Sequence, residues 1–486
     1  MSTINSPQSL TLTDFSTFNR EVNGQREING KPSYTVKEAA DVLTRTGQRW
    51  LDNNGDGWTD VSYRMRDKPG ELFPAYGLGG FSALDTAAQE AAKAAMNKWS
   101  DVAKVRFTDA TSGGTSEGNI AFSQFATTNG PFDTSLASSV PTADTQRFAA
   151  KYPELSRVGV TSEIFLDAND QAVTAPSPNN QGLALYLHEV GHALGLSHPH
   201  EVRLGGPRYA QDTIGYSVMS YWEEHRSGQN FTKNGMHYTP VGPMVDDIAA
   251  IQKLYGANRN VRTGNTTYGF NSNADRDDFR LKRSTDVALF TIWDPKGESD
   301  AVDFSGYSDD QLINLNPGQP SNIGGMVGNV FIALGVTIEN AIGGTGNDVF
   351  IPNRAQNTLT GNGGNNTYKY LSVKQSTPDK PDRITDFVSG KDKVDVSEMH
   401  RKGARKGAKD TESNGQRPPA LVGPVKLVEQ FSGRRSEAVL SYDPAAKQAR
   451  LEIDVKGNGT ADFLLLIDSQ TPLKPTDIVV EKSSMH

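Results

Sequence analysis

The sequence predicts two domains, an α+β domain over residues 31–257 followed by an all-β domain over residues 258–486. Apolar residues in the first half recur at spacings of three and four, which is the period of an amphipathic helix. After Ala257 this period fades, and Gly, Asn and Asp separate short apolar pieces, as in β-rich domains. A chain of 486 residues is also too long for one core, since domains usually hold about 50 to 250 residues.

The first domain combines long helices with short strands. Trp99 closes an alanine-rich helical pattern and is expected to anchor that helix in the core. Gly195 and Gly256 stand where two later helices are expected to end. In chain order the expected elements are a helix over 81–99, strands over 105–108 and 119–122, a loop-like stretch over 126–181, and helices over 182–194 and 246–255.

A nine-residue step runs through the second domain, at Ile332, Ala341, Phe350, Leu359 and Tyr368. Such a step is typical of a parallel β-roll, in which each turn stacks on the one before it. Residues 382–397 and 437–467 are expected to form further strands of a closing β-sandwich, and 401–420 a solvated loop between them.

Composition excludes several classes of function. The net charge of −8 leaves no basic stripe for nucleic acid, and no apolar run reaches the roughly 18 to 20 residues that span a bilayer. The chain has no cysteine, so disulfides and thiolate chemistry are ruled out. Residues 1–30 are polar and lack the pattern of a signal peptide, and we interpret them as a leader or pro-segment, with a mobile terminus as the alternative.

The helix over 182–194 carries a candidate metal site. His188 and His192 are four residues apart and therefore share one helix face, with Glu189 beside them. Gly195 permits a sharp turn that returns His198 to the same point. Three histidines leave one coordination position open for water, which is the arrangement of a catalytic zinc site.

The chemistry expected of this site is hydrolysis without a covalent intermediate. Zinc lowers the pKa of bound water from about 15.7 toward roughly 7 and polarises a peptide carbonyl. Glu189 is placed to take the proton of that water and pass it to the leaving amine. Two structural histidines on a buried helix are the plainer interpretation, but the five specified positions from His188 to His198 argue against it.

The string His188-Glu189-x-x-His192-x-x-Gly195-x-x-His198 is the metzincin signature, and a methionine turn follows at 217–222. Over most of its length the chain resembles the serralysin family of bacterial metzincin proteases. Further segments that carry the resemblance are 246–258, 303–307 and 337–348. The resemblance implies an α+β metzincin catalytic domain followed by a calcium-loaded parallel β-roll and β-sandwich.

The resemblance also implies roles around the zinc. Met219 would lie beneath the metal, and the family spacing favours His198 over the nearby His200 as third ligand. Tyr221 would bind the zinc in the resting enzyme and turn away to hydrogen-bond the oxyanion in the transition state. The alternative for Tyr221 is a core aromatic residue.

Two sets of calcium ligands follow from the same resemblance, because calcium prefers six to eight oxygen ligands. Asn366 stands where the family has an aspartate, so fewer or weaker sites are expected. Without calcium the β-roll is expected to be poorly ordered. The first set is Gly344, Gly346, Asp348, Gly361 and Gly363; the second is Arg262, Gly264, Thr266, Asp294, Asp300, Thr337 and Glu339.

Substrate binding is predicted at Asn119, Ile120 and Ala121, in a stretch that resembles the family's cleft-lining edge strand. An extended peptide can add to such an edge through backbone hydrogen bonds, which favours broad specificity. The competing interpretation of this short apolar run is a buried strand.

The family resemblance implies a secreted, extracellular monomer that cleaves proteins and peptides. A type I (ABC) secretion apparatus would recognise the C-terminal region, where 476–480 resembles the family's export motif, and a small periplasmic-type protein inhibitor is expected. Two other functions stay open at this point. One is an inactive, calcium-dependent binding or adhesion protein, and the other is a zinc exopeptidase.

Overall fold

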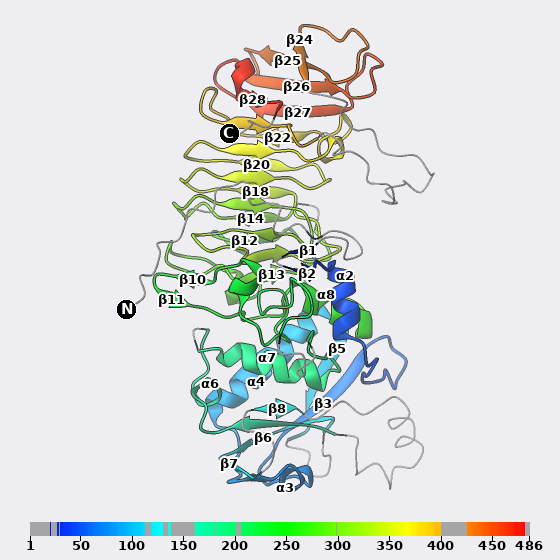
Figure 1. Cartoon of the computed structure of the whole chain (residues 1–486), viewed down its shortest axis with the longest axis vertical. Helices are drawn as coiled ribbons and strands as arrows, with labels where there is room; N and C mark the ends of the chain where they lie inside the picture. The colour runs from blue at the N-terminus through cyan, green and yellow to red at the C-terminus, as the bar shows by residue number, and fades with distance from the viewer. Residues whose placement is uncertain are drawn as a thin grey trace.

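The computed structural model describes residues 20, 27–28, 30–111, 118–129, 135–137, 161–178, 180–200, 206–297, 299–399 and 425–481. The molecule is elongated, with helices and one mixed sheet at one end and a long stack of short strands reaching to the other (Figure 1). Among the described residues, no helix has both the length and the apolar character needed to cross a membrane. Most of the predicted leader, 1–30, lies outside the described residues.

The catalytic half is built on a five-stranded sheet in the order β5-β3-β6-β9-β8. β3 pairs in parallel with β5 and β6, β6 pairs in parallel with β9, and β8 alone runs antiparallel. The predicted loop over 126–181 is wrong in part, because it contains the fully paired strand β9. The strands are β3 (Thr59–Met65), β5 (Val105–Asp109), β6 (Ile120–Phe125), β8 (Leu136–Ala137) and β9 (Ser162–Asp167).

The expected edge strand is not an edge. β6 lies between β3 and β9, so Ile120 and Ala121 have paired backbones and fully buried side chains. Asn119 donates its backbone N–H to Ser62 O, and its side-chain Oδ1 accepts from Ser62 N. The prediction that these residues offer a free edge to substrate is therefore wrong, and the competing interpretation of a buried strand is correct.

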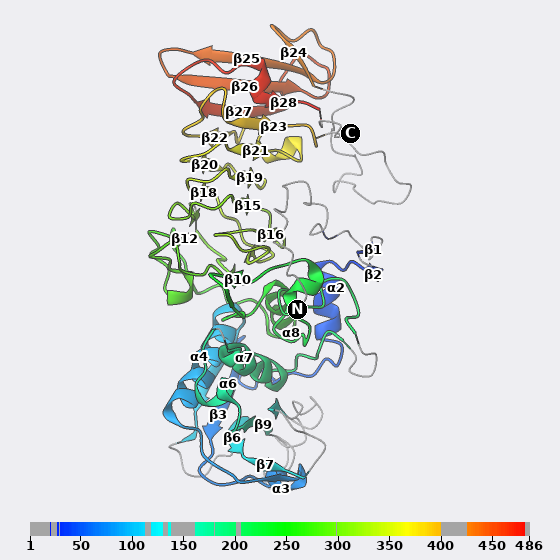
Figure 2. The same cartoon turned by 60° about the vertical axis from the view of Figure 1, so that its left-hand side comes forward.

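Three main helices, α4 (Thr86–Val102), α7 (Gly182–Ala193) and α8 (Val245–Tyr255), match the predicted ones in place. Asp85 caps the start of α4 by accepting from Ala88 N. Trp99, on α4, is fully buried and donates its indole N–H to Leu187 O of α7, as its predicted anchoring role requires. α4 and α7 lie side by side over the sheet (Figures 1 and 2).

Shorter elements surround this core. The helices are α2 (Val36–Leu43), α3 (Leu72–Ala75) and α6 (Gln171–Thr174). The two-residue strands are β1 (Glu27–Ile28), β2 (Lys31–Pro32), β4 (Leu78–Gly79), β7 (Thr127–Thr128), β10 (Thr232–Lys233) and β11 (Met236–His237).

The second half is a parallel β-roll, as the nine-residue step predicts. Ala341, Phe350, Leu359 and Tyr368 lie on four successive strands that alternate between two stacks, and all four are fully buried. One stack contains β12 (Thr267–Gly269), β14 (Ala301–Asp303), β18 (Asn340–Ile342), β20 (Thr358–Thr360) and β22 (Asp382–Ile384). The other contains β15 (Leu312–Asn314), β19 (Val349–Ile351), β21 (Thr367–Lys369), β23 (Lys393–Asp395) and β28 (Ile478–Val479).

Longer strands close the far end of the roll (Figure 1). β27 pairs in parallel with β22, the last rung of the first stack; β25, β26 and β27 then pair antiparallel, and β24 adds to β25 in parallel. The closing strands are β24 (Lys426–Val428), β25 (Glu437–Asp443), β26 (Gln448–Asp454) and β27 (Phe463–Asp468). A small third sheet joins β13 (Phe290–Ile292), β16 (Pro320–Ser321) and β17 (Val330–Ile332). The predicted loop over 401–420 lies outside the described residues.

Candidate active site

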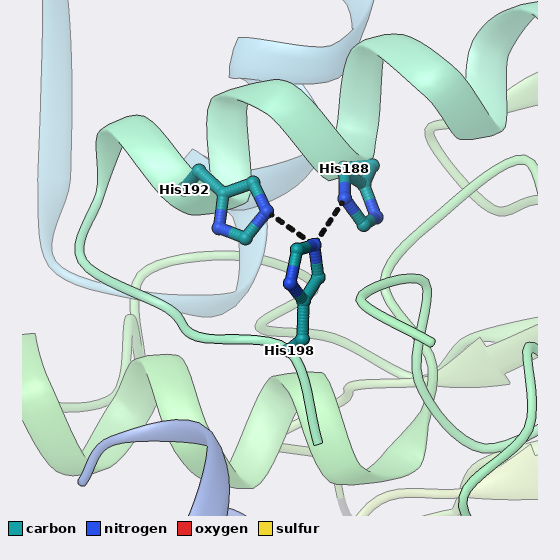
Figure 3. Close-up of side chains that lie close together, drawn as sticks. All are labelled: His188, His192 and His198. Atoms are coloured by element: carbon teal, nitrogen blue, oxygen red, sulfur yellow. Dashed lines mark hydrogen bonds between the residues drawn. The ribbon is translucent and has the colours of Figure 1, made fainter. Parts of the chain in front are cut away.

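Helix α7 presents His188 and His192 from one face, and His198 approaches them from the loop that follows (Figure 3). The three side chains are the one group of possible metal ligands that converges among the described residues. His198 Nε2 lies 3.2 Å from His188 Nε2 and 2.9 Å from His192 Nε2. Three ring nitrogens aimed at one point form the ligand set expected of a zinc site.

Gly195 makes the turn that brings His198 back. Its φ is +99°, a region that other residues rarely adopt, and a Cβ there would lie 2.1 Å from Gln48 O. Leu196 N donates to Gly191 O, which closes the end of the helix, and the chain then runs toward His198. A glycine is needed at 195 both for the backbone conformation and for the close approach of Gln48.

Backbone carbonyls fix the orientation of the two helical imidazoles. His188 Nδ1 is 2.8 Å from Val218 O, and His192 Nδ1 is 2.8 Å from Leu196 O. Because a carbonyl can only accept, both Nδ1 atoms carry the proton, and both Nε2 atoms keep a lone pair for a metal. Burial lowers the pKa of His188 to about 3 and that of His192 to about 4, so both rings are neutral near pH 7.

Glu189 follows His188 on helix α7, and one of its carboxylate oxygens has no hydrogen-bond partner among the described residues. The residue is 3% exposed, and this oxygen is its Oε2. Burial raises the pKa of Glu189 to about 8. An unpartnered, buried carboxylate next to a metal-ligand cluster can take up and release a proton near neutral pH, as a general base must.

Met219 packs against helix α7, the helix that carries His188 and His192. It is fully buried, and a Cβ on Gly191 of α7 would lie 2.5 Å from its sulfur. Gly191 lies between Glu189 and His192 in the motif, so the absence of a side chain at this position lets the methionine pack directly under the ligand helix. Sequence reasoning placed Met219 but missed this requirement at Gly191.

Asp247 on α8 holds the methionine turn in place. Its Oδ1 accepts from Ser217 Oγ at 2.6 Å, and its Oδ2 accepts from Val218 N at 2.8 Å and Met244 N at 2.9 Å. Val218 in turn offers the carbonyl that orients His188. Sequence reasoning missed this role, because an acidic residue in the first turn of a helix is already explained by the helix dipole.

Tyr221 stands over the zinc ligands with its ring centre 4.4 Å from that of His198 and 5.5 Å from that of His188. It is 59% exposed, so the alternative of a core aromatic residue does not hold. Burial of the phenol and the charge of Glu189 raise the pKa of Tyr221 to about 12, so it is a hydrogen-bond donor near neutral pH.

His200 is not part of the ligand cluster. Its ring stacks on His198 at 5.2 Å, and its Nδ1 lies 3.5 Å from Asp212 Oδ1. Asp212 also accepts from Ser220 Oγ next to Tyr221. His200 therefore packs behind His198, and the preference for His198 as third ligand agrees with the geometry.

An open cleft is lined by His188, Glu189 and Tyr221. β8 is the last strand of the described sheet on this side, and Ser135, which precedes it, lines the cleft. The rest of the lining is partly apolar and includes Ala184, Leu185, Val218 and Trp222. An extended chain has room along this surface next to the metal ligands.

The predicted calcium ligands fall into two places in the roll. Asp348 Oδ1 accepts from Gln311 N and its Oδ2 from Gly344 N, and burial raises the pKa of Asp348 to about 6. One turn further on, Asn366 Nδ2 donates to Gly363 O at 2.9 Å. The predicted calcium ligand at Gly363 stays a prediction. Gly346 and Gly361 lie in the same pair of turns, and Gly361 N donates to Asp386.

The second predicted set gathers at the start of the roll. Asp300 Oδ1 accepts from Thr266 N, and Glu339 Oε2 accepts from Asp300 N. Asp294 Oδ2 accepts from Tyr268, while its buried Oδ1 has no partner among the described residues. Burial, with repulsion from Asp294 and Glu339, raises the pKa of Asp300 to about 7. Crowded carboxylates of this kind suit a cation.

Three residues of the second set, Gly264, Arg262 and Thr337, form no hydrogen bond with its carboxylates that the structure describes. Gly264 O accepts from Thr266 Oγ1. The Arg262 side chain points elsewhere, since its Nε donates to Trp293 O and its Nη1 to Asp275. Thr337 is exposed, and no hydrogen bond joins it to the carboxylates.

Three convergent imidazoles, a buried free carboxylate and a methionine turn beneath them define a zinc metalloendopeptidase of the metzincin class. Family comparison agrees. Residues 81–212 match the model described as Matrixin, and residues 257–480 match the model described as Peptidase M10 serralysin C terminal.

Full-length relatives give the particular family. The chain is 42% identical to "Metalloprotease AprA" of Pseudomonas entomophila, over 94% of this chain and 92% of that protein. It is 38% identical to "Metallopeptidase AprA" of Pseudomonas marginalis, over 94% and 93%. It is 36% identical to "Serralysin A" of Dickeya chrysanthemi, over 93% and 92%. The chain belongs to the serralysin family, and as a member of it is a secreted zinc metalloprotease.

Proposed function

We propose that this chain is an endopeptidase of broad specificity in which Glu189 is the general base. The observation that carries the proposal is the convergence of three Nε2 atoms next to a buried carboxylate oxygen of Glu189 that has no hydrogen-bond partner among the described residues. His188, His192 and His198 would hold the zinc. When bound there, zinc supplies a Lewis acid that activates water and polarises the substrate carbonyl.

The protein's own groups divide the remaining work. Glu189 accepts a proton at its free Oε2 and delivers it to the leaving amine. Tyr221 offers its phenolic O–H to the negative charge that develops on the substrate oxygen. Its position above His198 and its exposure allow it to move between a metal-binding and a substrate-binding orientation.

Strand β8, the last strand of the sheet among the described residues, is the better place for substrate than β6. We infer that an extended peptide lies along β8 near Ser135, in place of the predicted contact with 119–121. Backbone hydrogen bonds along a strand do not depend on the side chains of the bound peptide, which supports broad specificity.

Calcium, export and partners complete the proposal. The carboxylates of Asp294, Asp300 and Glu339 and the Gly344–Asp348 turn would hold calcium, which would stabilise the roll because it binds only the folded state. Export follows the type I route, with the C-terminal strand β28 and its neighbours as signal. The chain acts as a monomer on protein and peptide substrates, and a small inhibitor protein guards the producing cell.

The test is hydrolysis of a denatured protein by the purified chain, beside Glu189→Gln. Activity is expected to vanish with a zinc chelator and return with zinc, and the variant should bind zinc yet cleave nothing measurable. Internal fragments in the products distinguish an endopeptidase from an exopeptidase. A zinc-loaded wild type that cleaves nothing would favour the calcium-dependent binding protein instead.

A further inference from the structure

Arg20 lies within the predicted leader, yet it is buried in the catalytic domain. Its Nη1 and Nη2 donate to Asp246 Oδ1 and Oδ2, at 2.6 and 2.9 Å. The guanidinium carbon also lies 4.4 Å from the centre of the Tyr216 ring. A two-pronged arginine–carboxylate pair stacked on an aromatic ring is a directional anchor, because the planar fork fits only one orientation.

Asp246 precedes Asp247 in the first turn of α8, and both are fully buried. Asp247 accepts from the methionine turn, whereas Asp246 pairs with Arg20, the one cation within ion-pair distance of it among the described residues. Two adjacent buried carboxylates repel each other unless a cation neutralises one of them. Arg20 therefore neutralises the carboxylate that stands directly before Asp247, the residue that accepts hydrogen bonds from Ser217, Val218 and Met244.

A short path of contacts leads from this pair to the metal ligands. Asp246 N donates to Tyr216 O at the start of the turn that contains Met219. Asp247 then holds Val218 N, and Val218 O is 2.8 Å from His188 Nδ1. The Arg20 guanidinium therefore contacts both residues of the hydrogen bond from Asp246 N to Tyr216 O, with which this path begins.

We propose that Arg20 is a positioning residue of the zinc site, and that a maturation cut of this chain must leave Arg20 attached. The segment up to residue 30 is then not wholly removable. The proposal rests on the zinc protease function proposed above. Removal of Arg20 leaves Asp246 as a buried, unpaired charge next to Asp247, and the methionine turn and His188 lose their fixed geometry.

The experiment compares three variants of the full chain. Arg20→Gln leaves Asp246 unpaired, and Arg20→Gln/Asp246→Asn removes both charges. Arg66→Gln is the matched control, because Arg66 also forms a buried two-pronged pair, with Glu163 of β9, a strand that carries neither a histidine of the cluster nor the methionine turn. Zinc affinity is measured by competition with a chromophoric chelator, kcat and KM with a quenched peptide, and Tm by thermal unfolding.

Arg20→Gln is expected to weaken zinc affinity by about 10 to 100-fold, the range typical of a lost outer partner of a metal ligand. The double variant should recover most of this loss. Arg66→Gln should lower Tm without a change in zinc affinity. If Arg20→Gln lowers only Tm, like the control, Arg20 is a stability anchor and the proposal is overturned. If Arg20→Gln does not fold, Arg20→Lys, which keeps the charge but not the fork, takes its place in the comparison.

Mass spectrometry of the active, mature protein tests where its N-terminus lies relative to Arg20. The N-terminus is expected at or before Arg20, and active chains that begin after Arg20 with full zinc affinity would overturn it. Since zinc affinity needs no catalysis, a wild type that binds zinc but cleaves nothing contradicts the proposed function alone.

Discussion

Asn366→Asp should make the stability of its β-roll turn depend more strongly on calcium. Asn366 is buried, its Oδ1 accepts from Asp348 N, and its Nδ2 donates to Gly363 O. The side-chain N–H therefore stands where a cation would otherwise face the glycine carbonyl. The substitution keeps the shape, removes this donor, and places a carboxylate against a carbonyl oxygen without compensation.

The magnitude follows from that single bond. A buried group left without its partner costs about 1 to 3 kcal/mol, and a charge costs more. A loss of 2 kcal/mol would lower Tm by roughly 4 to 8 °C for a domain of about 150 to 250 residues. Calcium at 100 times its Kd would return about 2.7 kcal/mol, because it binds only the folded state.

Thermal unfolding with a calcium chelator and with excess calcium measures both effects, and calorimetry counts the ions bound. Asn357→Asp is the matched control, since Asn357 occupies the same repeat position on another turn, next to 352–356, which contains no glycine. The control should lose stability and gain no calcium. A variant with wild-type Tm in chelator, or without an added calcium ion, would refute the reasoning.

Three further substitutions test other parts of the structure. Tyr221→Phe should lower kcat by about 100-fold or more with little change in KM, the loss expected of one oxyanion donor; an unchanged kcat in peptide assays would contradict this role. Gly191→Ala should lower the free energy of unfolding by about 1 to 3 kcal/mol, because the new Cβ would contact Met219. If denaturant unfolding shows wild-type stability, the Met219 side chain moves aside at no cost and the prediction is wrong. Burial raises the pKa of Asp382 from 3.8 to about 8, so the folded state holds the proton more tightly than the unfolded chain, and stability should fall as pH rises through this window. Asp382→Asn should remove that fall, and equal pH slopes for both proteins would argue against it.

The features that the sequence predicted correctly are local ones. His188 and His192 share a helix face because of their spacing, and Gly195 marks the return to His198. The nine-residue step likewise predicts the roll, since each turn repeats the same buried position. Such patterns depend on neighbours in the chain, so one sequence is enough to read them.

The features it missed depend on distant partners. β9 was hidden in a stretch rich in Ser, Thr, Pro and Asn, and its buried Glu163 pairs with Arg66, which is far away in the sequence. The order of strands decides which one is the edge, and nothing in 118–122 reveals that β9 covers that side. The edge assignment was wrong for this reason, although the strand itself was predicted.

The first turn of α8 shows why apolar packing alone does not build this zinc site. A packed core fixes where Met219 lies, but it cannot choose which nitrogen of His188 carries a proton. That choice depends on Val218 O; Val218 N donates to Asp247, and Asp246 beside Asp247 pairs with Arg20. Asp247 accepts three hydrogen bonds and Asp246 accepts two from Arg20, so five hydrogen bonds meet at the first turn of α8. If the proposal for Arg20 holds, the geometry of the histidines depends on this buried polar network, in which the loss of one partner is costly.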